Sequence, residues 1–245
     1  MALPSPTVLV GGTNVGSTTN ASSYATATFT VASGSLLIYA CAVSDADDPG
    51  TMNISNTGTW TSLPTWTERC NVSNPTTITD RLKIWTGVGG ASSGASTITV
   101  SGMPDVCTGR ANILLAYPSG WDTGAPIINI VTASDNTTAL SETLTFAAAG
   151  SASNHLVAFL MKAGSSIPAL TTEGNWALTG VNQAYASPNR NVMCALDESA
   201  SDTTVAWTWT TVAHSCSAGV EVVAAAGGAA DPFPFVGGSY YPTEG

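Results

Sequence analysis

Hydrophobic and polar residues alternate along the chain in short segments, and the same order of segments occurs twice. Each pass has a Thr-rich strand, an apolar strand, a Gly-x-Trp, an Arg-led strand, a Thr-rich strand and a closing apolar strand. The first pass occupies residues 24–31, 34–43, 57–60, 81–87, 95–102 and 109–117. The second occupies residues 141–148, 154–161, 173–176, 190–196, 202–209 and 218–226. Short segments of this kind, separated by Gly, Pro, Asn and Asp, are typical of all-β proteins.

This pattern predicts two similar antiparallel β-sandwich units of the jelly-roll or immunoglobulin-like type, related by an internal duplication. The spacing between matching positions drifts along the chain, as expected if loops tolerate insertion and strands do not. Residues 34–43 are apolar on both faces, which predicts a central strand covered on both sides. No segment of the chain has a convincing helical period.

The predicted organisation has four parts: an arm at residues 1–20, sandwich units at 21–125 and 126–228, and a second arm at 229–245. Both arms contain apolar residues outside the alternating pattern, and such segments dock on other surfaces. We expect the arms to contact other chains through Val8, Leu9, Val10, Phe233, Phe235, Val236, Tyr240 and Tyr241. The stretch at 7–10 is also compatible with a strand, in this fold or in a neighbour.

Composition narrows the classes of partner. The chain has 245 residues, of which 44% are hydrophobic and 9% are charged, and its net charge is −10. Ordinary proteins carry roughly 25% charged residues. An acidic balance argues against nucleic acid, which requires a Lys/Arg surface, and against an anionic membrane. No basic segment precedes the first apolar stretch, so no secretory signal is expected. The chain is then made in the cytoplasm, or a leader is absent from this sequence.

The cysteines predict thiols rather than a disulfide framework, because their number is odd and their spacing is wide. They are Cys41, Cys70, Cys107, Cys194 and Cys216. A bridge between Cys70 and Cys107 is the alternative. The two histidines, His155 and His214, are too far apart in sequence to complete a usual zinc site.

Other candidate chemistry has a simpler explanation in turns. The acidic stretch 45–50 could hold calcium but lacks the spacing of an EF-hand loop, so an acidic turn is favoured. His214 lies near Cys216 in sequence, but nothing in the pattern orients a catalytic pair. Asp197, Glu198 and Asp202 lie in or beside a turn. The Gly-rich stretch 87–94 is a hairpin loop. We therefore predict no catalytic residues, no metal and no cofactor.

The tryptophans are compatible with either burial or an exposed binding surface. Trp60 and Trp176 occupy matching positions of the two passes, which favours packing in a core. Trp207 and Trp209 share one strand face, so they could form an exposed platform or be buried at an interface or in a core, and burial is favoured. With Trp121 they are the residues that could stack on sugars.

The sequence resembles β-sandwich virion proteins of tailed bacteriophages, in the head-decoration and minor tail or fibre group. The resemblance rests on SLLIYACAV, on RLKIWTGVGGASSGASTITVSG and on RANILLAYPSGWDTGAPI, and covers residues 24–135 best. It implies a structural protein of the virion, made in the host cytoplasm, and not an enzyme. Its implied partners are the major capsid protein, other virion proteins and copies of itself. Alternatives are a tail or fibre component and a carbohydrate-binding or adhesin module.

Overall fold

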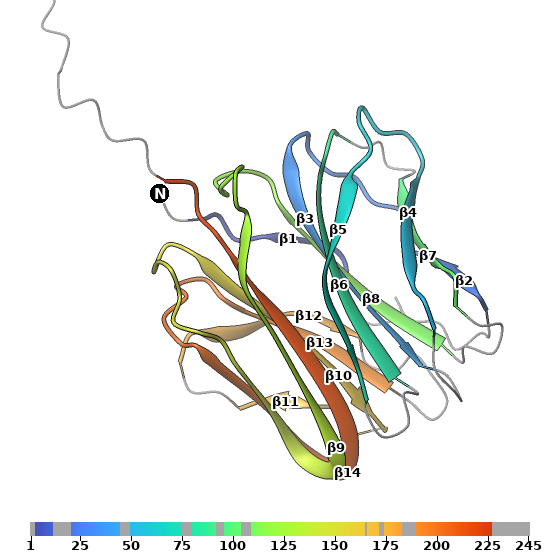
Figure 1. Cartoon of the computed structure of the whole chain (residues 1–245), viewed down its shortest axis with the longest axis vertical. Coiled ribbons are helices and arrows are strands. Elements are labelled where there is room, and N and C mark those ends of the chain that lie inside the picture. Colours follow the sequence, from blue (N-terminus) through green and yellow to red (C-terminus); the bar gives the residue numbers. More distant parts are fainter. Residues whose placement is uncertain are drawn as a thin grey trace, which may run out of the picture.

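The computed structural model describes residues 3–11, 21–44, 50–74, 80–91, 96–103, 109–164, 166–171, 174–182 and 190–226. Within these ranges the regular elements are β-strands paired in antiparallel fashion, which confirms the all-β prediction. Figure 1 shows the strands stacked in layers.

The first unit contains β1 to β8. These strands are β1 (Thr7–Val10), β2 (Ser23–Ala25), β3 (Ser35–Ser44), β4 (Asn53–Thr57), β5 (Thr65–Ser73), β6 (Asp80–Gly89), β7 (Thr97–Ser101) and β8 (Gly109–Tyr117). They form a five-stranded sheet in the order β1-β8-β3-β6-β5 and a three-stranded sheet in the order β2-β7-β4. Pairing the first strand with the eighth, and the second with the seventh, is the connectivity of a jelly roll. In this unit β5 extends the larger sheet.

The second unit has the same connectivity with fewer, longer strands. Its strands are β9 (Ile127–Thr145), β10 (His155–Ala163), β11 (Ala169–Leu170), β12 (Trp176–Asn182), β13 (Arg190–Asp197) and β14 (Thr204–Val222). The start of β9 pairs with the end of β14, beside β10, β13 and β12. The end of β9 pairs with the start of β14, beside β11. The halves of β9 therefore take the places of β1 and β2, and those of β14 the places of β7 and β8.

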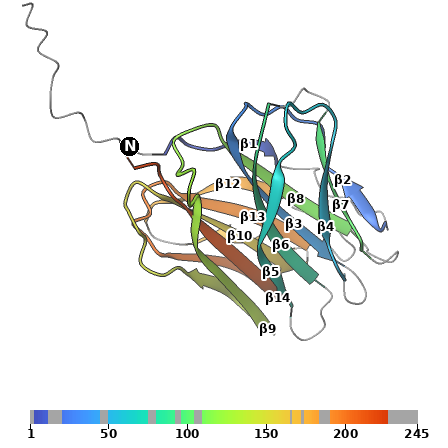
Figure 2. The same cartoon turned by 45° about the horizontal axis from the view of Figure 1, so that its top comes forward.

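Three apolar cores separate four layers of strands. The shared core lies between the two larger sheets and takes residues from β3, β6, β8, β10, β13 and β14. The outer core of the first unit lies between its two sheets, and the second unit has an equivalent outer core. In Figures 1 and 2, β2, β4 and β7 lie on the side of the first sheet away from β10 and β13. The two sandwiches therefore form one continuous body.

This layering explains why the central strands are apolar on both faces. Along β3, Leu36 and Ile38 face the shared core, whereas Leu37 and Tyr39 face the outer core. Every residue of β3 and of β10 is buried. Each large apolar side chain buried in this way contributes about 1.5–3 kcal/mol to folding. The prediction of a central strand at 34–43 is confirmed.

Of the alternatives for residues 7–10, a strand within this fold is observed, so Thr7–Val10 do not belong to an arm. These residues form β1, which pairs with β8, and Val10 is buried in the first outer core. Val8 packs on the shared core and Leu9 on the outer core. Their apolar side chains are covered by this chain, because the edge of the larger sheet gives the strand a place within its own unit.

Candidate functional site

Both ends of the described chain converge at one turn of the second unit. The amide of Leu3 donates to the carbonyl of Ser153 over 3.5 Å. The amide of Ala224 donates to Oδ1 of Asn154 over 3.0 Å. Trp121, which follows the last strand of the first unit, forms a β-bridge with Ala224. The start of the chain, the connection between units and the last described segment therefore meet beside residues 153–154.

A buried carboxylate fixes this meeting point. Glu221 accepts hydrogen bonds from Nδ2 of Asn154 and of Asn129, and from the amide of Gly150 over 2.9 Å. Because a buried carboxylate is stable only when its oxygens are paired, these contacts hold the turn against β14. A single charge within the apolar segment AGVEVVAAA was the sequence signal for this network.

The surface at this meeting point is a shallow, partly polar hollow. It is lined by Asp122, Ile128, Gly150, Ser151, Ser153, Asn154 and Val223–Ala226. The chain continues into residues 227–245 from Ala226, so that segment starts at this hollow. The segment contains Phe233, Phe235, Val236, Tyr240 and Tyr241, which lie outside the described residues.

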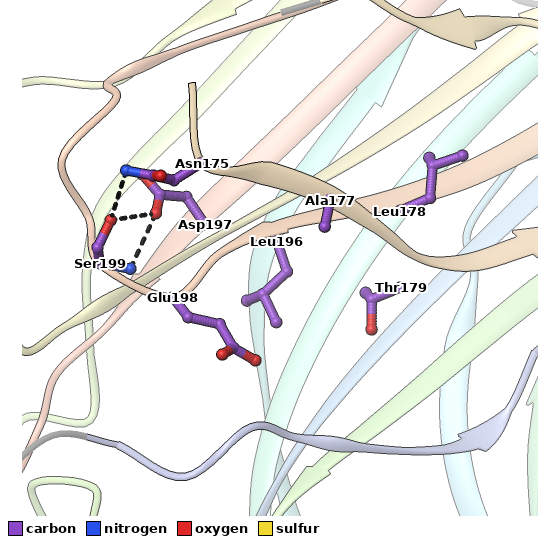
Figure 3. A pocket seen from close by; sticks show the side chains of 8 residues that line it. All are labelled: Asn175, Ala177, Leu178, Thr179, Leu196, Asp197, Glu198 and Ser199. Atoms are coloured by element: carbon purple, nitrogen blue, oxygen red, sulfur yellow. Dashed lines mark hydrogen bonds between the residues drawn. The ribbon is translucent and has the colours of Figure 1, made fainter. Parts of the chain in front are cut away.

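A second pocket, of about 530 Å³, lies along the edge strand β12. Figure 3 shows Ser199 hydrogen-bonded to both Asn175 and Asp197 at one end of the pocket. Ala177, Leu178 and Thr179 line the pocket along the strand. Its lining contains no aromatic side chain. A sugar site of the kind expected from stacking tryptophans is therefore not formed here.

The carboxylate in this pocket organises a turn. Asp197 accepts from the amide and hydroxyl of Ser199 over 2.8 and 2.7 Å, and from the amides of Ser201 and Asp202 over 3.0 and 2.9 Å. Burial by itself would raise the pKa of the Asp197 carboxyl, but these hydrogen bonds outweigh it and lower the pKa. Since its acceptor sites are occupied by the chain itself, Asp197 has a structural role, as the turn interpretation predicts.

His155 and the four described cysteines are buried, whereas His214 is partly exposed. His155 of the second unit contacts the hydroxyl of Tyr117 of the first unit, with 3.3 Å between Nδ1 and Oη. Burial lowers the pKa of His155. Burial raises the pKa of the Cys216 thiol well above its ordinary value. A thiol of that kind is a poor nucleophile, so its closeness in sequence to His214 creates no catalytic pair. Cys41, Cys70, Cys194 and Cys216 are buried free thiols, whereas Cys107 lies outside the described residues.

Of the alternatives for Trp207, Trp209 and Trp121, packing in a core is observed, and an exposed stacking platform is contradicted. Their exposed fractions are 0%, 5% and 8%. Trp207 and Trp209 lie in the second outer core and Trp121 lies in the shared core. Nε1 of Trp209 donates to the carbonyl of Ala139 over 2.8 Å. Alternation placed Trp207 and Trp209 on one face, but the layer that covers this face is formed by distant strands.

The repeat-matched tryptophans pack against repeat-matched phenylalanines. Trp60 lies 5.9 Å from Phe29 between ring centroids, and Trp176 lies 5.9 Å from Phe146. Phe29 and Phe146 occupy the same position in the Thr-rich strands of the two passes. The core role expected for these tryptophans is observed, although Trp60 is only partly buried.

No three His, Cys, Asp or Glu side chains gather as a metal site within the described ranges. The acidic residues 45–49 lie outside those ranges. The described part of the chain has no helix that could cross a membrane.

Comparisons with protein-family models, curated proteins and solved structures gave no match.

Proposed function

We propose that the chain is a structural virion protein, and specifically a decoration protein that binds the outside of a bacteriophage capsid. The observation that supports this role is the convergence of the first and last described segments, at Leu3 and Ala224, beside one turn of a single four-layer body. Jelly rolls are common in viral capsid proteins, which agrees with this assignment. The resemblance of residues 24–135 to phage virion proteins points to the same class.

The body suits a mechanical role because its two units share a core. A force applied to one larger sheet is carried through packed side chains to the other, without a flexible linker between them. A protein that bridges capsid subunits under internal pressure needs this stiffness. Many weak contacts repeated over a symmetric shell then add up to firm attachment.

Attachment is assigned to residues 227–245, since they start at the hollow beside Asn154. Their aromatic residues would bind in extended form along a neighbouring capsid subunit or another copy of this chain. The net charge of −10 disfavours contact with the packaged DNA. The partners are therefore the major capsid protein and other virion proteins.

The test uses particles from the native source and two forms of the chain. The full-length chain should bind the particles and appear over the whole icosahedral head in cryo-electron micrographs. A chain that ends at Ala226 should unfold in the same cooperative transition but fail to sediment with the particles. A matched control is Ser239→Ala, which leaves the aromatic residues intact and should bind normally.

Two results would overturn the proposal. Density confined to the tail or its tip would make the chain a tail or fibre component. Binding that persists in the folded truncated chain would show that attachment does not depend on residues 227–245.

A further inference from the structure

Lys162 is a buried amine whose partners are carbonyls. Its exposed fraction is 0%, and Nζ donates to the carbonyls of Ala163 and Ser166 over 2.6 and 2.8 Å. Nζ also lies 5.7 Å from the centroid of the Trp209 ring. No carboxylate pairs with Lys162 in the part of the chain that the structure describes. A buried ammonium without a counter-ion is costly, so this site favours a neutral nitrogen.

The lysine of the first unit shows the contrast. Lys83 is also buried, with 4% of its surface exposed, but its Nζ forms an ion pair with Oε2 of Glu68 over 2.9 Å. The first unit therefore neutralises its buried lysine with an acid, and the second unit does not.

A carboxamide lies beside Lys162. Asn191 is directly opposite Lys162 in the β10–β13 ladder, and it is fully buried. Its Nδ2 donates to the carbonyls of Gly164 and Ser166 over 2.8 and 3.4 Å, and Nζ of Lys162 contacts the same two oxygens. Its Oδ1 is buried with no hydrogen-bond partner. The amine and the carboxamide therefore share acceptors while one amide oxygen is left open.

The other side of Lys162 carries groups that can move a proton. Ser215 is opposite Lys162 in the β10–β14 ladder, and its hydroxyl donates to Glu142. Burial raises the pKa of the Glu142 carboxyl. Burial and then the nearby charge of Arg190 lower the pKa of Lys162 to about 8, so a minority of the amine is neutral at neutral pH and the neutral fraction rises in mildly basic solution.

We propose that the Nζ of Lys162 and the Cγ of Asn191 become joined by an intramolecular isopeptide bond. The neutral amine attacks Cγ, the Cγ–Nδ2 bond breaks, and one proton of Nζ passes to Nδ2, which leaves as ammonia. The product has no buried charge, and its remaining N–H can donate to the carbonyl of Ser166. This site is independent of the proposed function.

The test is the intact mass of the full-length chain under denaturing conditions. The cross-linked chain should weigh about 17 Da less than its sequence requires, which is the mass of ammonia. Digestion with trypsin should give no cleavage after Lys162 and should yield a branched peptide that contains Lys162 and Asn191. The variants K162R and N191A should have their full sequence masses. The control K83R should keep the mass deficit, because Lys83 is ion-paired with Glu68 and takes no part in the proposed bond.

Two results would overturn the inference. The wild-type chain could show its full sequence mass while it unfolds cooperatively, which would mean that the folded site does not react. Alternatively, the mass deficit could persist in K162R, which would assign the loss of ammonia to another asparagine. The wild-type measurement decides the matter even if a variant fails to fold.

Discussion

Arg190 donates from Nε to Oδ1 of Asp80 over 2.9 Å, and this ion pair joins the two units. Asp80 begins β6 and Arg190 begins β13, which are matching strands in the two sandwiches. The side chain of Asp80 is buried and that of Arg190 nearly so. The first residues of two matching strands therefore contact each other at the edge of the shared core, and they have opposite charges.

Breaking this pair should destabilise the whole body. Arg190→Met leaves the buried Asp80 carboxylate without this partner, and we expect a loss of about 3–5 kcal/mol in the free energy of unfolding. The double variant Arg190→Met with Asp80→Leu should lose less, since no charge is left behind. Urea unfolding followed by tryptophan fluorescence measures both. Equal losses in the single and double variants would contradict this account.

The shared core also predicts how the units unfold. Since both larger sheets bury one face against each other, neither unit can lose its partner without exposing that face. Wild-type chain should unfold in one transition, with the same midpoint by fluorescence and by circular dichroism. Two separated transitions would show that the units are independent.

Gly219 is required because the ring of Phe146 occupies the space of a side chain. A Cβ at Gly219 would lie 2.3 Å from Cζ of Phe146 and 3.0 Å from the carbonyl of Val157. Gly219→Val should therefore cost about 1–3 kcal/mol or more through overpacking. Adding Phe146→Ala should relieve part of that cost, so the two effects measured by thermal unfolding should not be additive. Additive losses would show that the ring and residue 219 do not compete for space.

Asp197 should contribute stability that depends on pH. Asp197→Ala removes an acceptor for four donors, and we expect a loss of about 3 kcal/mol at neutral pH. The pKa of Asp197 is lower in the folded state than in the unfolded state, where it is about 3.9. The contribution of Asp197 to the free energy of unfolding is therefore present above that pH and is lost as pH falls through the folded-state pKa. The difference in unfolding free energy between wild type and variant should shrink below about pH 4. A difference that stays constant down to pH 2 would contradict the assignment.

The buried thiols should be unreactive until the chain unfolds. Burial raises the pKa of Cys41 to about 11 and, with the nearby charge of Glu68, that of Cys70 to about 12. Little thiolate is then available at pH 8. Iodoacetamide labelling resolved by mass spectrometry should leave Cys41, Cys70, Cys194 and Cys216 unmodified in native protein and modify all four in urea. Labelling of Cys41 or Cys194 in the native state would show that the central strands open.

Much of the architecture could be predicted from local patterns. Residues 34–43 were predicted to form a strand covered on both faces, because Val, Leu and Ile occur on both faces. The structure confirms this, since β3 is buried throughout. The matching positions of Trp60 and Trp176 predicted packing in a core, and each ring contacts a phenylalanine. Glu221, Lys162 and Asn191 are buried polar residues in apolar strands, and their positions in the sequence do not show which residues they contact.

The sequence by itself determined the all-β class, the repeated order of strands and the apolar character of the central strands, because side-chain alternation along a strand is a local property. The tertiary structure decided what covers each face. It placed Val8–Val10 in an edge strand, buried Trp207 and Trp209, and brought Lys162 beside Asn191 and Asp80 against Arg190. These relationships depend on strand pairing and sheet stacking between distant segments, where many arrangements satisfy the same alternation and only packing selects one.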